Sequence, residues 1–153
     1  MTCALAAMLA GLAARDVQAA THVFPLQGVW TLVAADKVLQ TGETTRDYGE
    51  RPKGRLMVDV MGRYSLQIFK SERVRFASGN KSDGSADEMR SVVMGSSTHY
   101  GTMTIDDIEG SSFPNWEGTI QRRQYTLDGR ELRYKVPPRQ DGSIPISVWH
   151  RVE

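Results

Sequence analysis

The chain has 153 residues, of which 40% are hydrophobic and 24% charged, which indicates one folded domain with a sizeable core. Its net charge of +1 gives no electrostatic basis for binding nucleic acid or an anionic membrane, since both require clustered Lys and Arg. Cys3 is the only cysteine, which excludes an intramolecular disulfide and a Cys-based metal site or nucleophile in the folded body. No run of about eighteen apolar residues exists, so no transmembrane helix is predicted.

Residues 1–20 differ in composition from the rest of the chain. The segment 3–14 is rich in Ala and Leu, and residues 17–19 end in small side chains that suit signal peptidase. We interpret residues 1–20 as a signal peptide that exports the domain formed by 21–153 to the periplasm or outside. The basic n-region is missing, because no Lys or Arg precedes Arg15. An N-terminal helix that covers the domain, in a cytoplasmic protein, is the alternative.

Short alternating segments follow, bounded by turn residues, as is typical of antiparallel strands. Tight turns are expected at Gly62, at Asp128-Gly129 and at Asp141-Gly142. The polar segment 39–54 is a long loop of the kind that can edge a pocket. The predicted strands span residues 28–35, 55–61, 63–70, 73–77, 100–106, 117–127, 131–136 and 144–152.

One segment breaks the strand pattern. Ser85 and Glu88 form a capping-box pair, apolar residues follow at helical spacing, and Gly95 can end the helix. About eight short strands with a single short helix predict an all-β fold, either an antiparallel barrel or a sandwich. A barrel of about eight strands leaves no exposed edge and can enclose one small ligand.

The clearest alternation in the chain precedes the first Asp-Gly turn. If Tyr125 and Leu127 face the core, Gln121 and Arg123 point inward with them. An inward Arg is costly unless it is paired or faces a wet cavity. The pattern therefore predicts a cavity in which Arg123 holds a carboxylate, enolate or carbonyl oxygen by a charge-assisted hydrogen bond. The structural alternative is that Arg123 pairs with a carboxylate such as Glu117 or extends to the rim.

Tyrosine side chains supply walls and hydroxyl groups for such a cavity. The expected ligand-binding residues are Tyr64, Tyr100, Gln121, Arg123 and Tyr125. No nucleophile elbow of the Gly-x-Ser-x-Gly type and no glycine-rich phosphate motif is present, so hydrolase and nucleotide-dependent functions lose support and no cofactor is expected.

Metal binding and paired-carboxylate chemistry are weakly supported. His22, His99 and His150 lie far apart and have no carboxylate or Cys at ligand spacing, so no metal site is predicted and scattered surface or hinge positions are expected. The carboxylates at 106, 107 and 109 can form an acid/base pair only if their environments differ, and a solvated turn is the favoured interpretation.

Several short pieces resemble known sequences. Gly28-Val29-Trp30 resembles the Gly-x-Trp signature of lipocalins and related calycins, and further pieces resemble the bacterial and fungal lipocalin-like domain family over about 26–152. The resemblance implies an eight-stranded up-and-down antiparallel barrel with a lidded cavity, in which Arg151 packs over Trp30. The further pieces are residues 62–65 (GRYS), 75–80 (RFASGN), 112–118 (SFPNWEG) and 149–151 (WHR).

Three function classes follow from these observations. The first is a barrel that binds a small, mainly apolar or amphipathic ligand with a carbonyl or anionic group. The second is a cofactor-free isomerase, cyclase or lyase acting in the same cavity, with Glu117, Tyr100 or His99 as the titratable group. The third is an interaction module with a solid barrel and an exposed apolar patch. Ligand identity, any reaction and the oligomeric state stay open.

Overall fold

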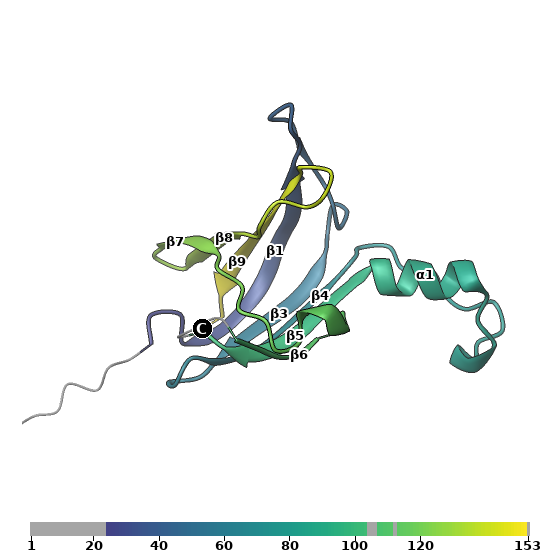
Figure 1. Cartoon of the computed structure of the whole chain (residues 1–153), viewed down its shortest axis with the longest axis horizontal. Coiled ribbons are helices and arrows are strands. Elements are labelled where there is room, and N and C mark those ends of the chain that lie inside the picture. The colour runs from purple at the N-terminus through teal and green to yellow at the C-terminus, as the bar shows by residue number, and fades with distance from the viewer. Residues whose placement is uncertain (1–23, 104–106, 112, 153) are drawn as a thin grey trace, which may run out of the picture.

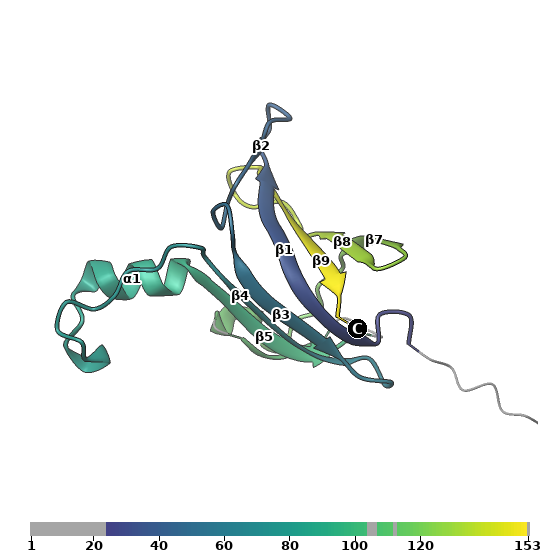
Figure 2. The ribbon, with the colours of Figure 1, turned by 180° about the vertical axis from the view of Figure 1, so that it is seen from behind.

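The chain folds into a strongly curved antiparallel sheet from which one helical arm projects (Figures 1 and 2). This computed structural model describes residues 24–103, 107–111 and 113–152, so the expected signal peptide lies outside the described residues. The strands are β1 (Gly28–Val38), β2 (Thr44–Thr45), β3 (Lys53–Val58), β4 (Arg63–Phe69), β5 (Ser96–Thr102), β6 (Asp107–Ser111), β7 (Gln124–Asp128), β8 (Glu131–Lys135) and β9 (Ile144–Arg151). The helices are α1 (Ala86–Met94) and the short 3-10 turns η1 (Lys81–Asp83) and η2 (Pro114–Trp116). None of the helices in the described ranges has the length and apolar character needed to span a membrane.

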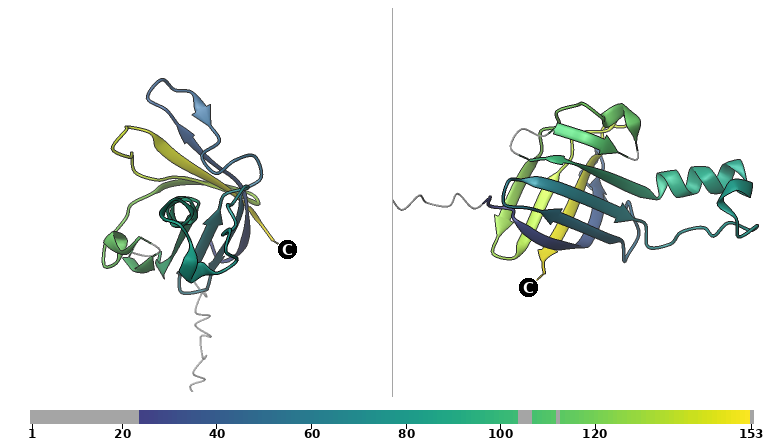
Figure 3. Two further views of the ribbon diagram at one scale, coloured as in Figure 1. Left: turned by 90° about the vertical axis from the view of Figure 1, so that its right-hand side faces the viewer. Right: turned by 90° about the horizontal axis from the view of Figure 1, so that it is seen from below.

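The strand order is β6-β5-β4-β3-β1-β9-β8-β7, and β2 pairs with β1 beside this path. The first and last long strands therefore meet in the middle of the sheet, and β6 and β7 form its two ends. The all-β, antiparallel expectation with one helix is confirmed. In the described part of the chain no pairing joins β6 to β7, so the sheet is open, and its closure into a barrel stays a prediction (Figure 3).

Two of the predicted strands are wrong. Residues 73–77 form no strand, because β4 already pairs with β3 on one side and β5 on the other. The strand predicted over 117–127 begins only at Gln124, where a partner on β8 is available. Sequence analysis also did not predict β6, the strand at one end of the sheet.

The core lies on one face of the sheet, which we call the inner face. Directly paired residues of neighbouring strands share a face, so Trp30, Leu56, Leu66 and His99 form one row across β1, β3, β4 and β5. All four side chains are buried. A second buried row runs through Leu32, Trp149 and Leu132.

The predicted helix is confirmed. The Ser85 Oγ atom accepts a hydrogen bond from the Glu88 backbone N–H, and the Glu88 carboxylate accepts one from the Ser85 N–H at 2.7 Å. The other carboxylate oxygen of Glu88 accepts from the Ala77 N–H, also at 2.7 Å, which ties the helix start to the preceding loop. This arm projects from one end of β4 and β5 (Figure 2).

Arg151 of β9 binds the segment that precedes β1 and holds it against one end of the sheet. Its guanidinium carbon lies 4.3 Å from the centroid of the Trp30 ring, so the packing expected from the family resemblance is present. The same guanidinium donates hydrogen bonds to the carbonyl oxygens of Gln27, at 2.5 Å, and Pro25, at 3.2 Å. The Trp30 indole N–H donates to the Leu26 carbonyl at 2.9 Å.

Replacing Arg151 with Met should lower the free energy of unfolding by about 2 kcal/mol. The change removes the cation from the Trp30 face and leaves two carbonyl oxygens without a charged donor. The matched control is Arg133→Met, which removes an exposed ion pair with Glu131 and should cost less than about 1 kcal/mol. Urea denaturation followed by tryptophan fluorescence measures both. Equal losses in the two variants would contradict the structural role of Arg151.

Candidate functional site

A hollow of about 1250 Å³ lies on the inner face of the sheet. Residues of strands β1, β4, β5, β8 and β9, of the connection 113–123, of the two loops around Tyr48 and Arg139, and the last residue of α1 line it. Most of its lining surface is apolar, although about half of the lining residues carry a polar or charged group. The apolar lining residues are Ala35, Leu66, Ile68, Met94, Phe113, Trp116, Ile120, Tyr134, Val136, Pro137, Pro138, Pro145 and Ile146.

The connection 113–123 links one end strand of the sheet to the other. Pro114 begins the short turn η2, and Gly118 adopts a positive φ of 68°, so this part of the chain cannot continue as a regular strand. The Thr119 hydroxyl donates to the Trp116 carbonyl at 2.6 Å, which holds the turn. The Trp116 ring meets His99 edge-on, with centroids 6.1 Å apart. The connection therefore packs against the inner face.

Arg123 and Gln121 line the hollow, together with Ile120 and Arg122 at the alternate positions. The half-buried guanidinium of Arg123 lies 5.2 Å from the centroid of the Tyr134 ring and donates to the Gln121 side-chain oxygen at 3.0 Å. Among the described side chains no carboxylate, including exposed Glu117, forms an ion pair with Arg123. Arg122 also borders the hollow, but it is exposed, so water solvates its charge. The binding role of Gln121 and Arg123 stays a prediction.

His99 is a buried polar group in the wall of the hollow. It is 5% exposed, and its Nδ1 atom is 3.0 Å from the Tyr64 hydroxyl. Burial, and then the nearby positive charge of Arg123, lower the pKa of His99 to about 3, so the imidazole is neutral near pH 7. The expectation of a surface or hinge histidine is wrong here, because the register of β5 places His99 opposite Leu66 on the inner face.

The exposed His150 does fit the surface expectation. Its Nε2 atom is 3.3 Å from the Glu131 carboxylate. His22 lies outside the described residues, as do the side chains of the carboxylates at 106, 107 and 109. In the ranges that the structure describes, no group of three or more His, Cys, Asp or Glu side chains converges as metal ligands would.

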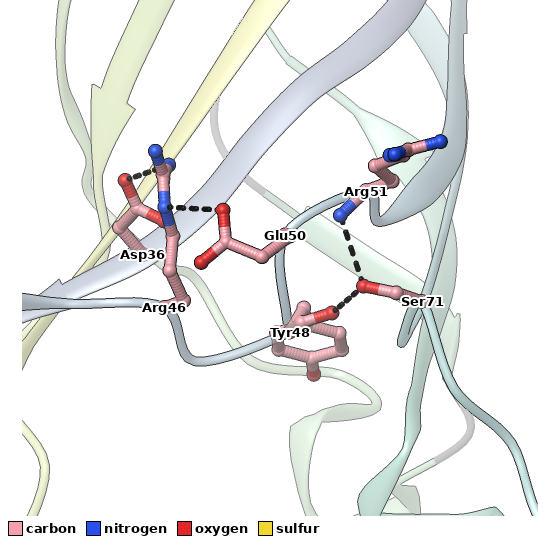
Figure 4. Close-up of polar contacts among 6 residues, drawn as sticks. All are labelled: Asp36, Arg46, Tyr48, Glu50, Arg51 and Ser71. Carbon is pink, nitrogen blue, oxygen red and sulfur yellow. Dashed lines mark hydrogen bonds and ion pairs between the residues drawn. The ribbon is translucent and has the colours of Figure 1, made fainter.

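Tyr48 lines the hollow from the loop that follows β2, and sequence analysis did not single it out. Its N–H donates to the Ala35 carbonyl at 3.1 Å, and its own carbonyl accepts from the Ser71 N–H at 2.9 Å. The same carbonyl accepts from the Ser71 hydroxyl at 3.0 Å (Figure 4). Ser71 Oγ also accepts from the Arg51 N–H. Gly49 has a positive φ of 81°, and an added Cβ would lie 2.3 Å from Ser71 Oγ, so this close approach requires glycine.

The loop that carries Tyr48 is also held by ion pairs. Arg46 binds Asp36 on β1 at 3.1 Å and lies 3.6 Å from Glu50 (Figure 4). The Tyr48 ring packs against the core and points away from its own loop. Burial, and then the charge of Asp47, raise the pKa of the Tyr48 phenol, so it stays protonated and can donate a hydrogen bond. The sequence feature that could have indicated a role for Tyr48 is its position as an aromatic residue in a polar, glycine-rich loop.

Two loops meet at the end of the hollow near Tyr48. Asp47 accepts a 2.6 Å hydrogen bond from Arg139 and lies 3.7 Å from the Lys37 ammonium group. The hydrogen bond to Asp47 is the main reason that the pKa of Arg139 is raised. Gln40 donates to the Asp141 carbonyl at 3.1 Å. The charges at this end are therefore already paired within the protein.

The three tyrosines expected to bind ligand occupy different places. Tyr64 lies behind His99 and packs against the core. Tyr125 pairs with Tyr134 and shares its face, but it is 53% exposed because β7 is an end strand with nothing beside it in the described structure. Tyr100 follows His99 in β5, so it points to the outer face and is 52% exposed. Neither Tyr100 nor Tyr125 lines the hollow.

The neutral, buried state of His99 predicts a pH dependence of stability. In the unfolded chain its pKa is about 6.5, so between pH 6.5 and about 3 the unfolded state binds a proton that the folded state does not. The free energy of unfolding therefore decreases as the pH is lowered from 6.5 to about 3. His99 contributes at most about 1.4 kcal/mol per pH unit to this decrease.

His99→Gln should flatten the slope of unfolding free energy against pH between pH 4 and 6, whereas exposed His150→Gln should not. Urea denaturation at half-unit pH steps measures both slopes. A wild-type slope in His99→Gln would show that His99 is accessible to protons in the folded state.

The comparisons with known proteins agree with the sequence resemblance. A family model described as a lipocalin-like domain matches residues 27–152. This range includes every strand of the sheet and all the residues that line the hollow. Searches of curated proteins and of solved structures found no match.

Proposed function

The chain belongs to the lipocalin-like domain family, and on this basis we propose that it binds a small, mainly apolar ligand through a carbonyl or anionic group. The observation that carries the proposal is Arg123. Its guanidinium faces an apolar hollow, is half-buried, and has no carboxylate partner among the described residues. A cation in such a position is stabilised when a ligand oxygen accepts its hydrogen bonds.

The remaining lining supports the same ligand chemistry. Gln121 and His99 are neutral hydrogen-bonding groups beside Arg123, so the inner part of the site carries a single positive charge. That charge suits one carboxylate, enolate or polarised carbonyl, and the apolar wall suits a hydrocarbon or aromatic body. Closure of the sheet into a lidded barrel is part of this proposal, supported by the connection 113–123 that already spans from β6 to β7.

A cofactor-free isomerase or cyclase is the second candidate, and one observation favours it. Three residues were expected to supply the titratable group for such a reaction. Only His99 lines the hollow, whereas Glu117 and Tyr100 are exposed. A neutral imidazole beside Arg123 can stabilise a developing enolate oxygen. The low pKa of His99 makes it a weak base, however, which supports ligand binding over proton abstraction.

The third class, a solid interaction module, has less support because of the hollow. Export to the periplasm or outside stays a prediction that rests on residues 1–20. Native mass spectrometry of protein purified from its own host tests for a bound ligand directly. The proposal expects a co-purified small molecule with an acidic or carbonyl group.

The role of Arg123 is tested with dansyl-labelled undecanoic acid and its methyl ester. Arg123→Gln should weaken binding of the acid 10- to 100-fold, about 1.4–2.8 kcal/mol, because a charge-assisted hydrogen bond is lost. Binding of the uncharged ester should change much less. The control Arg133→Gln removes a cation that does not line the hollow and should leave both affinities unchanged. Dansyl fluorescence measures the dissociation constants, and an unchanged affinity of Arg123→Gln for the acid would refute the proposal.

A further inference from the structure

We propose that the hollow recognises a two-ended ligand, with an anionic or carbonyl oxygen at Arg123 and a neutral hydrogen-bond acceptor at the Tyr48 hydroxyl. An apolar body joins the two ends. This inference rests on the proposed function and narrows its ligand class. Both residues line the same hollow, and they come from segments far apart in the sequence.

The Tyr48 hydroxyl is prepared to donate to a ligand. Three hydrogen bonds to the Tyr48 backbone fix the position of the residue. Its N–H donates to the Ala35 carbonyl, and its carbonyl accepts from the N–H and the hydroxyl of Ser71. The ring packs against the core, so the direction of the hydroxyl is restricted as well. Among the described residues this hydroxyl forms no hydrogen bond, and Tyr48 lines the hollow. A rigid donor without an acceptor contributes affinity at little cost in conformational entropy.

The register of the sheet places the two polar groups some distance apart along one wall. Arg123 stacks on Tyr134 of β8, which pairs with Ser147 of β9, which pairs with Ala35 of β1. Ala35 in turn accepts the hydrogen bond from Tyr48. Two strand spacings therefore separate Tyr134 from Ala35, which is about 10 Å. Between them lie the Tyr134 ring and the small Ser147 and Ala35 side chains, and the wall of the hollow continues through apolar Val136 and Ile146.

Charge at the Tyr48 end excludes a second anion. Asp47 is paired with both Arg139 and Lys37, and Asp36 is paired with Arg46. Asp141 adds a third carboxylate beside Lys37 and Arg139, so three cations face three carboxylates and no net positive charge remains to attract a second anionic group. The second group of the ligand is therefore neutral: a hydroxyl, an ether or a carbonyl oxygen.

The test uses two series of straight-chain alkanoic acids from 8 to 16 carbons, one unsubstituted and one with a terminal hydroxyl group, with chain lengths chosen to span roughly 10 Å and beyond. Each acid displaces dansyl-undecanoic acid from the full chain. At the best length, the hydroxyl should raise the affinity of the wild-type protein about fivefold, the expected effect of one hydrogen bond.

Tyr48→Phe should abolish this gain while binding the unsubstituted acids as the wild type does. Tyr100→Phe, which removes an outer-face hydroxyl, should keep the full gain. Ser71→Ala loosens the Tyr48 loop without removing the phenol and should reduce the gain. Circular dichroism confirms that each variant is folded.

The outcomes separate this inference from the proposed function. If the terminal hydroxyl gives no gain at any length, or if the gain persists in Tyr48→Phe, the two-ended ligand is refuted while acid binding at Arg123 stands. If Arg123→Gln binds the unsubstituted acids as tightly as the wild type does, the proposed function fails, and this inference fails with it.

Discussion

The pairing of β1 with β9 is the constraint on which the rest of the structure depends. It brings the first and last long strands together in the middle of the sheet and places Trp30 and Trp149 in the core. It also sets Arg151 of β9 over Trp30, where Arg151 binds the segment that precedes β1. Because these strands take the centre, β6 and β7 are left as the ends of the sheet. The connection between those ends packs against the inner face through Trp116 and His99, and it brings Arg123 to the hollow.

The polar groups of the hollow have distinct electrostatic states. Burial keeps His99 neutral and keeps the Tyr48 phenol protonated, so both act as uncharged hydrogen-bonding groups. Asp47 neutralises Arg139 at the loop end, whereas Arg123 has only the Tyr134 ring and the Gln121 amide as partners among the described residues. The result is a site with one localised positive charge in mainly apolar surroundings, where a charge-assisted hydrogen bond contributes most.

Two of the residues that the sequence predicted for the site, Gln121 and Arg123, line the hollow, and their binding role stays a prediction. Ile120 and Arg122 at the alternate positions line it as well, because this segment is an irregular connection that precedes β7. The same parity set Tyr125 on the inner face, yet it is exposed because no strand lies beside β7 in the described structure. In β5 the sequence analysis expected Tyr100 to line the cavity, but its neighbour His99 lies on the inner face instead. Adjacent residues of a strand point to opposite faces, so a shift of one residue in the pairing exchanges the two.

The sequence by itself determined the class of the fold, most strand positions, the capped helix, and the packing of Arg151 on Trp30 that the family resemblance implied. These features depend on local periodicity, on turn and capping chemistry, and on short motifs. All of these involve residues that are close together in the sequence. Only the tertiary structure decided which strands end the sheet, and that His99 and Tyr48 border the same hollow as Arg123. That arrangement depends on pairing between strands that are distant in sequence and on burial, which raises or lowers a pKa only after the chain has folded.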